Sequence, residues 1–191
     1  MLDPNITVEK REGGEYEPIP DDVYTVQLID INSEKRPTYD TRNKPDGEKE
    51  YELVFNFLFG LLDGMDDTGK ELRGRRLIQN FVPSYLYVSG KGKNKLYQIV
   101  EALQRQTVSP EQEAHGITGS DLNNLIGEQC RVGTKTEEKG EKKYTNIDKW
   151  MMVREEKTPF TADEKIKIGW PQKKDDAQEE NTVTPEDIPF D

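Results

Sequence analysis

The sequence holds one cysteine and one histidine among 191 residues, and this scarcity excludes several classes of protein. Cys130 has no partner for an internal disulfide bond, so we expect a reducing compartment, the cytoplasm, and interpret Cys130 as a core residue. His115 has no cysteine or second histidine near it. A zinc site is therefore not expected, and we predict neither a metal nor another cofactor.

Long apolar runs are also missing. No segment approaches the roughly 20 apolar residues of a membrane-spanning helix, and we identify no signal peptide before Asp3. Hydrophobic residues make up 32% of the chain and charged residues 34%, so the core must be modest and part of the chain unfolded. A length of 191 residues suits one domain with extensions.

The sequence lacks a catalytic constellation as well. Residues Gly64–Lys70 read GMDDTGK, which has the spacing of a phosphate-binding loop. However, Glu71 stands where a hydroxyl should bind magnesium, and Asp66 and Asp67 would repel phosphate. The same stretch fails as a calcium loop, because Gly74 occupies the place of the closing glutamate. We do not expect an enzyme.

The charge is unevenly distributed along the chain. The formal net charge of −11 by itself argues against a nucleic-acid ligand. Residues 68–105, however, hold eight basic and two acidic residues, a net charge of +6. The segments 1–67 and 171–191 carry net charges of −10 and −5. Because exposed charges are screened beyond roughly 10 Å, a local basic patch can bind an anion on an acidic protein.

Three strands are expected in the first half of the chain. Val23–Ile31 is rich in β-branched residues and predicts a strand. The polar residues 32–50 predict a long, mobile connection, and Tyr51–Phe59 alternates as a second strand. Residues 70–82 predict a third strand, with a bulge or bend at Gly74.

One face of the second predicted strand carries most of its rings. Tyr51, Leu53, Phe55, Phe57 and Phe59 fall at every second position and share that face. Such a face is typical of a barrel core. Alternatively, an aromatic residue at the strand end, such as Tyr51, offers a platform on which a base can stack.

The second half of the sequence predicts a helix followed by a hairpin. A helix capped by Asn94 runs to about Gln106, residues 107–118 form a loop, and a short helical turn directs Leu122, Leu125 and Ile126 inward. Two strands, 128–137 and 142–153, form a hairpin that carries Trp150, which is either core or stacking platform. No pattern follows Lys157.

This order of elements predicts the fold. Three strands, a helix and two strands is the order of a five-stranded Greek-key barrel of the oligonucleotide-binding (OB) type, with the helix between strands 3 and 4. We therefore predict a mainly β protein with an N-terminal arm (1–20), an OB-fold domain that binds single-stranded DNA (21–157) and a flexible acidic tail (158–191). The long first connection and the final hairpin are where this fold grips single strands.

The end of the chain, Glu186–Asp187–Ile188–Pro189–Phe190, resembles the acidic tip of bacterial and phage single-stranded DNA-binding proteins, with Asp191 added. The order and composition of residues 20–153 also resemble divergent phage members of this family. The resemblance implies sequence-independent binding of single-stranded DNA in replication, recombination and repair, in the host cytoplasm for a phage protein. It further implies that the tip, Asp187, Ile188, Pro189 and Phe190, recruits partner proteins.

The candidate DNA-binding residues are the basic and aromatic side chains of the first connection, the basic segment and the final hairpin, since cations neutralise phosphates and rings stack on bases. They are Arg36, Tyr39, Arg42, Tyr51, Arg73, Arg75, Arg76, Tyr85, Tyr87, Lys91, Lys93, Lys95, Lys135, Lys142, Lys143, Tyr144 and Trp150. Two alternatives stay open: an acidic adaptor or DNA mimic that binds a replication enzyme, and an OB-type RNA binder.

Overall fold

The structure of the chain, a computed structural model, describes residues 18–90, 92–140 and 142–170. Most of the predicted arm, Lys91, and the tail from residue 171 with its tip lie outside the described residues. The elements are β1 (Val23–Pro37), a 3-10 turn η1 (Asp46–Glu48), β2 (Tyr51–Leu61), β3 (Arg76–Pro83), β4 (Val88–Ser89), β5 (Gly92–Lys93), α1 (Lys95–Gln104), α2 (Pro110–His115), α3 (Gly119–Asn123), β6 (Gln129–Lys139), β7 (Lys142–Met152) and α4 (Ala162–Ile168).

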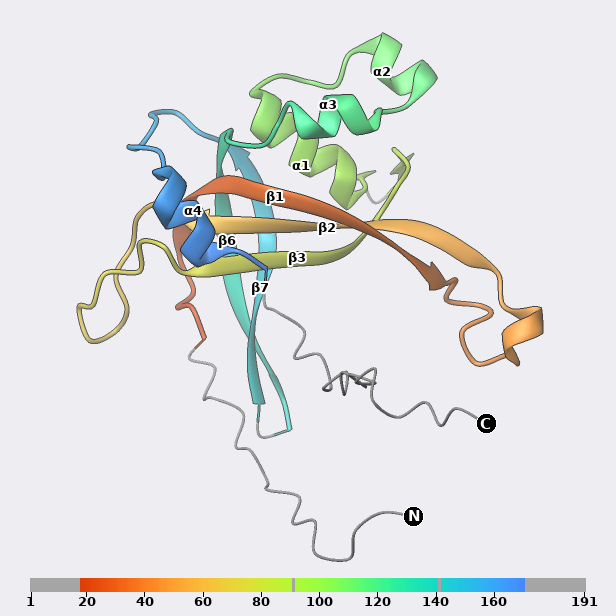
Figure 1. Cartoon of the computed structure of the whole chain (residues 1–191), viewed down its shortest axis with the longest axis horizontal. Helices are drawn as coiled ribbons and strands as arrows, with labels where there is room; N and C mark the ends of the chain where they lie inside the picture. The colour runs from red at the N-terminus through yellow and green to blue at the C-terminus, as the bar shows by residue number, and fades with distance from the viewer. Residues whose placement is uncertain (1–17, 91, 141, 171–191) are drawn as a thin grey trace, which may run out of the picture.

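Five of the strands form one antiparallel sheet in the order β3-β2-β1-β6-β7 (Figure 1). The mainly β fold and the helix between its third and fourth main strands are confirmed. Closure of the sheet into a barrel is not detected, since β3 and β7 do not pair in the described part of the chain. Helix α1 contacts both of these edge strands instead, and Lys95 Nζ donates a hydrogen bond to Gln79 Oε1 of β3 at 3.1 Å.

The first and third strands differ in length from the prediction. Strand β1 continues through the polar residues 32–37, which pair with 51–56 of β2, so the expected mobile connection is wrong for these six residues. Backbone pairing with β2 extends this strand although its end is largely exposed. Strand β3 begins only at Arg76, because Glu71 forms only an isolated bridge with Met65 and the chain then turns at Arg73 and Gly74, where Gly74 has a φ of 84°.

The core lies between the sheet and α1. Phe57 and Phe59 of β2 are fully buried with their rings stacked at 6.3 Å, and Phe55 meets Phe57 edge-on. The core interpretation of this strand face is thus confirmed for its inner positions, whereas Tyr51 at the strand end is 54% exposed. Cys130 is also fully buried, as predicted, and burial raises the pKa of its thiol.

Two features between α1 and β6 differ from the prediction. Residues 107–118 are not all loop, because Ser109 and Gln112 form a capping box that starts α2. Ile126, predicted to point inward, is 39% exposed, and Gly127 follows it with a φ of 100°. Among the described residues no helix is long and apolar enough to cross a membrane.

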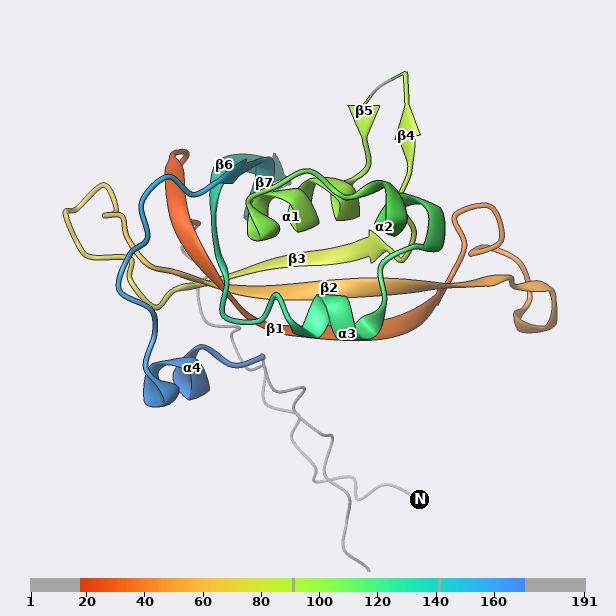
Figure 2. The ribbon, with the colours of Figure 1, turned by 90° about the horizontal axis from the view of Figure 1, so that it is seen from above.

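The segment after β7 folds back over the sheet. Helix α4 lies on the opposite side of β1–β3 from α1 (Figure 2), and Phe160 and Ile168 pack against Leu62 in a small apolar cluster. Trp170 Nε1 donates to Asp30 Oδ2 at 2.5 Å. Packing on the sheet therefore continues to Trp170, beyond the domain boundary expected at residue 157.

Gly60 gives a test of this packing. A methyl group on Gly60 would lie 2.6 Å from the Phe160 ring and 2.8 Å from the Ile168 side chain. We expect Gly60→Ala to lower the free energy of unfolding by about 1–3 kcal/mol, measured by urea denaturation. Gly133→Ala is the matched control, because its methyl group would meet only ordinary contact with Lys149 at 3.5 Å. Equal stability of the two variants would contradict the packing of α4 on β2.

Candidate nucleic-acid interface

A groove opens on the sheet face that α4 also covers, at the other end of the strands. Residues at every second position of β2 share this face, so Glu52 and Val54 lie on the same side as Gly60. The groove has a volume of about 260 Å³. It is lined by Arg36, Pro37, Tyr39, Arg42, Glu52, Val54, Phe81 and Pro83.

The first wall of the groove is an arginine stacked on a ring. The guanidinium carbon of Arg36 in β1 lies 3.7 Å from the centre of the Phe81 ring in β3. Val54 of β2, which lies between these two strands, is buried beneath them as an apolar floor. A cation over a ring is stabilised by about 0.5–1 kcal/mol at an exposed site.

The second wall repeats this pairing in the β1–β2 connection. Arg42 Cζ lies 4.2 Å above the Tyr39 ring, and Tyr39 is 74% exposed. Thr41 fixes the connection from within, since its buried hydroxyl lies 2.8 Å from the Thr38 hydroxyl and donates to the Glu50 carbonyl at 3.1 Å. The connection is thus shaped by hydrogen bonds around the two stacked side chains.

Phe81 reaches the groove through an unusual backbone conformation. Its φ of 58° lies in the left-handed region, which costs a residue with a side chain about 1–2 kcal/mol. The register between β2 and β3 shifts beside it, which marks a β-bulge. The buried Asn56 holds the bulge: its Oδ1 accepts from Phe81 N at 2.9 Å, and its Nδ2 donates to Asn32 Oδ1 at 3.0 Å.

The result of the bulge is an exposed ring. Phe81 is 51% exposed, although its neighbour Val82 is fully buried. Strained backbone clusters at functional sites, so the exposed Phe81 ring is a candidate contact for a ligand. The sequence analysis did not select Phe81 or Asn56. The available signal was the adjacent pair Phe81–Val82, which breaks the alternation of the strand.

Other predicted aromatic residues lie near this end of the sheet without joining the groove. Tyr51 begins β2 and lies on the face opposite Glu52 and Val54. Tyr85 and Tyr87 follow β3 and are more than half exposed. They lead into the β4–β5 arm, which stands out from the body in Figure 2.

Lys93 and Lys95 of the basic segment are engaged within the protein. Lys93 Nζ contacts both carboxylate oxygens of Glu101, at 2.6 and 2.7 Å, and lies over the Tyr97 ring. Tyr97 in turn donates its hydroxyl to Glu113, and this bond, with burial, raises the pKa of Tyr97 to about 12. Burial lowers the pKa of Lys95, whose ammonium contacts Gln79.

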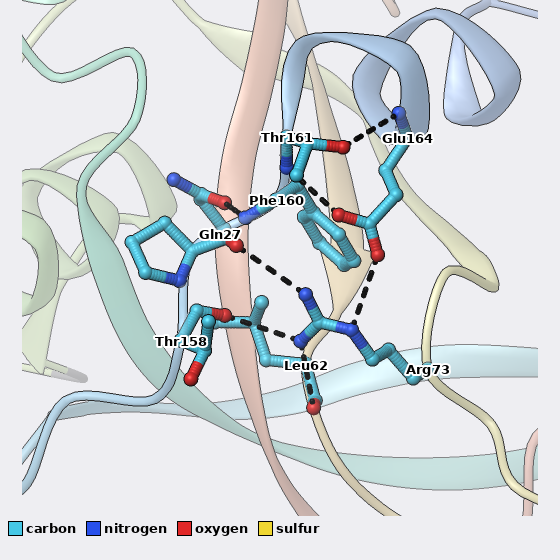
Figure 3. Close-up of polar contacts among 8 residues, drawn as sticks. Gln27, Leu62, Arg73, Thr158, Phe160, Thr161 and Glu164 are labelled. Carbon is cyan, nitrogen blue, oxygen red and sulfur yellow. Dashed lines mark hydrogen bonds and ion pairs between the residues drawn. The ribbon is translucent and has the colours of Figure 1, made fainter.

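Arg73 lies at the opposite end of the sheet, where it anchors the segment before α4 (Figure 3). Its guanidinium donates to the carbonyls of Leu62, Thr158 and Pro159 and to Glu164 Oε1, at 3.1–3.4 Å. Leu62 directly follows β2 and lies ten positions from Glu52, which corresponds to about 33 Å along an extended strand. Arg73 is therefore not brought together with the groove.

Arg75 and Arg76 lie at this same distant end. Arg75 lines a cavity of about 580 Å³ together with Arg73, Glu164 and Lys167 of α4. Arg76 begins β3 and is exposed. Because Asp66 and Glu71 line the same cavity as these cations, the site is not a uniformly basic surface.

The predicted residues of the final hairpin form a third location. The hairpin tip projects away from the β1–β2 connection in Figure 1. Lys135 and Tyr144 are exposed there, and Lys143 Nζ lies 3.2 Å from Glu138. The side chain of Lys142 lies outside the described part. Trp150 packs 5.3 Å from Phe59, which places its ring against the core.

Of the candidates, Arg36, Tyr39 and Arg42 are thus brought together, and Phe81 joins them.

In the described ranges no group of three or more metal-binding side chains occurs. No protein-family model matches the sequence, and no curated protein is similar enough to count as a relative. Function must therefore be inferred from the groove and its chemistry.

Proposed function

We propose that this chain binds single-stranded DNA through the groove, as a general single-strand binder in replication, recombination or repair. The observation that carries the proposal is the pair of arginine–aromatic stacks, Arg36 on Phe81 and Arg42 on Tyr39, around one opening. Rings stack on bases for about 1–3 kcal/mol each, and arginines neutralise phosphates. A single strand offers bases that are free to leave their stack, whereas a stiff duplex does not.

The proposal includes the finer assignment of the fold to the OB type. The strand order β3-β2-β1-β6-β7 and the position of α1 at the two sheet edges support it. In that fold the ligand crosses strands 2 and 3 and the loop between strands 1 and 2, where the groove lies. Recruitment of partner proteins through Asp187, Ile188, Pro189 and Phe190 belongs to the same proposal and rests on the sequence alone.

The test is a binding titration with a labelled single strand. Trp150 packs in the core and Trp170 bonds to Asp30, so neither indole would report directly on the groove. We therefore choose the fluorescence anisotropy of a fluorescein-labelled DNA of mixed sequence, about 16 nucleotides long, which one OB domain can cover. We expect saturable binding that weakens as salt is added, with at least about tenfold weaker competition by the duplex.

The competitor decides between the alternatives. An RNA of the same sequence that competes better than the DNA would assign the groove to RNA. Absence of binding to every nucleic acid, with the protein folded, would overturn the proposal and favour an adaptor that binds a replication enzyme.

A further inference from the structure

One side chain in the groove has the wrong charge for a phosphate site. Glu52 of β2 is partly exposed, lines the groove, and lies directly across from Arg36 in the β1–β2 register. An acid beside a bound polyanion is unfavourable unless it meets a different part of the ligand. The question is therefore what the Glu52 carboxylate accepts.

The arginines of the groove do not occupy this carboxylate. Each guanidinium lies over a ring, Arg36 at 3.7 Å from Phe81 and Arg42 at 4.2 Å from Tyr39. Within the described ranges no ion pair or hydrogen bond joins Glu52 to another side chain. Its oxygens are free to accept hydrogen bonds from a ligand that enters between the two stacks.

A carboxylate distinguishes bases by their hydrogen-bond donors. An ionised glutamate only accepts hydrogen bonds. Cytosine presents an amino group at N4, adenine at N6 and guanine at N2, and glutamate accepts well from such groups. Thymine presents a single N3–H between two carbonyl oxygens, and a carboxylate repels these oxygens. In a single strand these edges are unpaired and accessible.

We propose that Glu52 gives the groove a preference for bases that carry an exocyclic amino group and a disfavour of thymine. This inference rests on the proposed function and specifies the ligand of the same site. In this arrangement the rings of Phe81 and Tyr39 hold the base, and Arg36 and Arg42 contact the flanking phosphates. The Glu52 carboxylate accepts a hydrogen bond from the amino group at the edge of the base. Glu52 is then the residue that sets specificity in an otherwise tolerant groove.

The test compares oligodeoxycytidine with oligothymidine of equal length by anisotropy, at slightly alkaline pH, where cytosine is unprotonated. One hydrogen bond to a charged group corresponds to about 1.5 kcal/mol, so we expect the unaltered protein to prefer cytidine by about tenfold. In Glu52→Gln the amide both donates and accepts, and we expect the preference to fall below about twofold, mainly through tighter thymidine binding.

Glu48→Gln is the matched control, because it removes an equal charge from the exposed η1 turn of the same connection. It should strengthen binding of both oligomers alike and leave their ratio unchanged. Equal binding of both by the unaltered protein, or a ratio that survives in Glu52→Gln, would overturn the inference while leaving single-strand binding intact. Failure of both oligomers to bind would overturn the proposed function, and the inference with it.

Discussion

Replacement of Phe81 by glycine is expected to weaken single-strand binding strongly and to leave the protein more stable than the matched alanine variant. Both Phe81→Gly and Phe81→Ala remove the exposed ring and the stack with Arg36, so both should lose about 1–3 kcal/mol of binding, which is about 5- to 150-fold in affinity. They differ in the backbone. At a φ of 58° alanine keeps the strain and glycine relieves it.

Stability is therefore expected to favour glycine, against the usual order of these residues in a strand. We expect Phe81→Gly to unfold with a free energy about 1 kcal/mol above that of Phe81→Ala in urea denaturation. Affinity is measured by anisotropy on the same samples. If both variants keep the affinity of the unaltered protein, the ring is not a stacking platform. If alanine is the more stable, the left-handed backbone is not strained.

The double substitution Arg36→Ala with Arg42→Ala is expected to change the salt dependence of binding. Each phosphate contact contributes about 0.7 to the slope of log affinity against log salt for a single strand. Loss of both guanidiniums should reduce the slope by about 1.4 and weaken binding at low salt by about thirtyfold or more. The measurement is an anisotropy titration repeated over a series of salt concentrations.

The matched control removes two cations from α4, by Lys165→Ala with Lys167→Ala. The net charge changes equally, but these residues lie at the Arg73 end of the strands, about 33 Å from the groove by the length of β2, well beyond the screening length of about 10 Å. The control should keep the slope of the unaltered protein. If the slope of log affinity against log salt falls equally in both variants, the DNA strand follows no defined groove.

The sequence predicted those parts of the fold that depend on local pattern. The alternation of Phe55, Phe57 and Phe59, the apolar stripe of α1 and the final hairpin each follow from side-chain periodicity, because one face of each element must be buried. The burial of Cys130 was predicted from the absence of a second cysteine, and Cys130 is fully buried. The extension of β1 through residues 32–37 could not be predicted, since it depends on pairing with β2 and not on burial.

The candidate site was predicted in part. Arg36, Tyr39 and Arg42 were selected as basic and aromatic side chains of a polar connection, and these three line one groove. Arg73 was selected by the same criterion, yet its guanidinium is bonded to carbonyls of residues 158 and 159, more than eighty positions later in the chain. Composition cannot distinguish a cation that faces solvent from one that holds two segments together.

By itself, the sequence determined the order of the strands, the position of the helix and the types of residue that can bind a single strand, because these follow from periodicity and from the chemistry of side chains. Only the tertiary structure decided which of those residues meet. The bulge at Phe81 and its hydrogen bond to Asn56 turn the Phe81 ring outward. The alternation of the strand in the sequence does not distinguish this ring from a buried one. The physical reason is that a groove depends on contacts between strands, and such contacts are set by register and long-range packing.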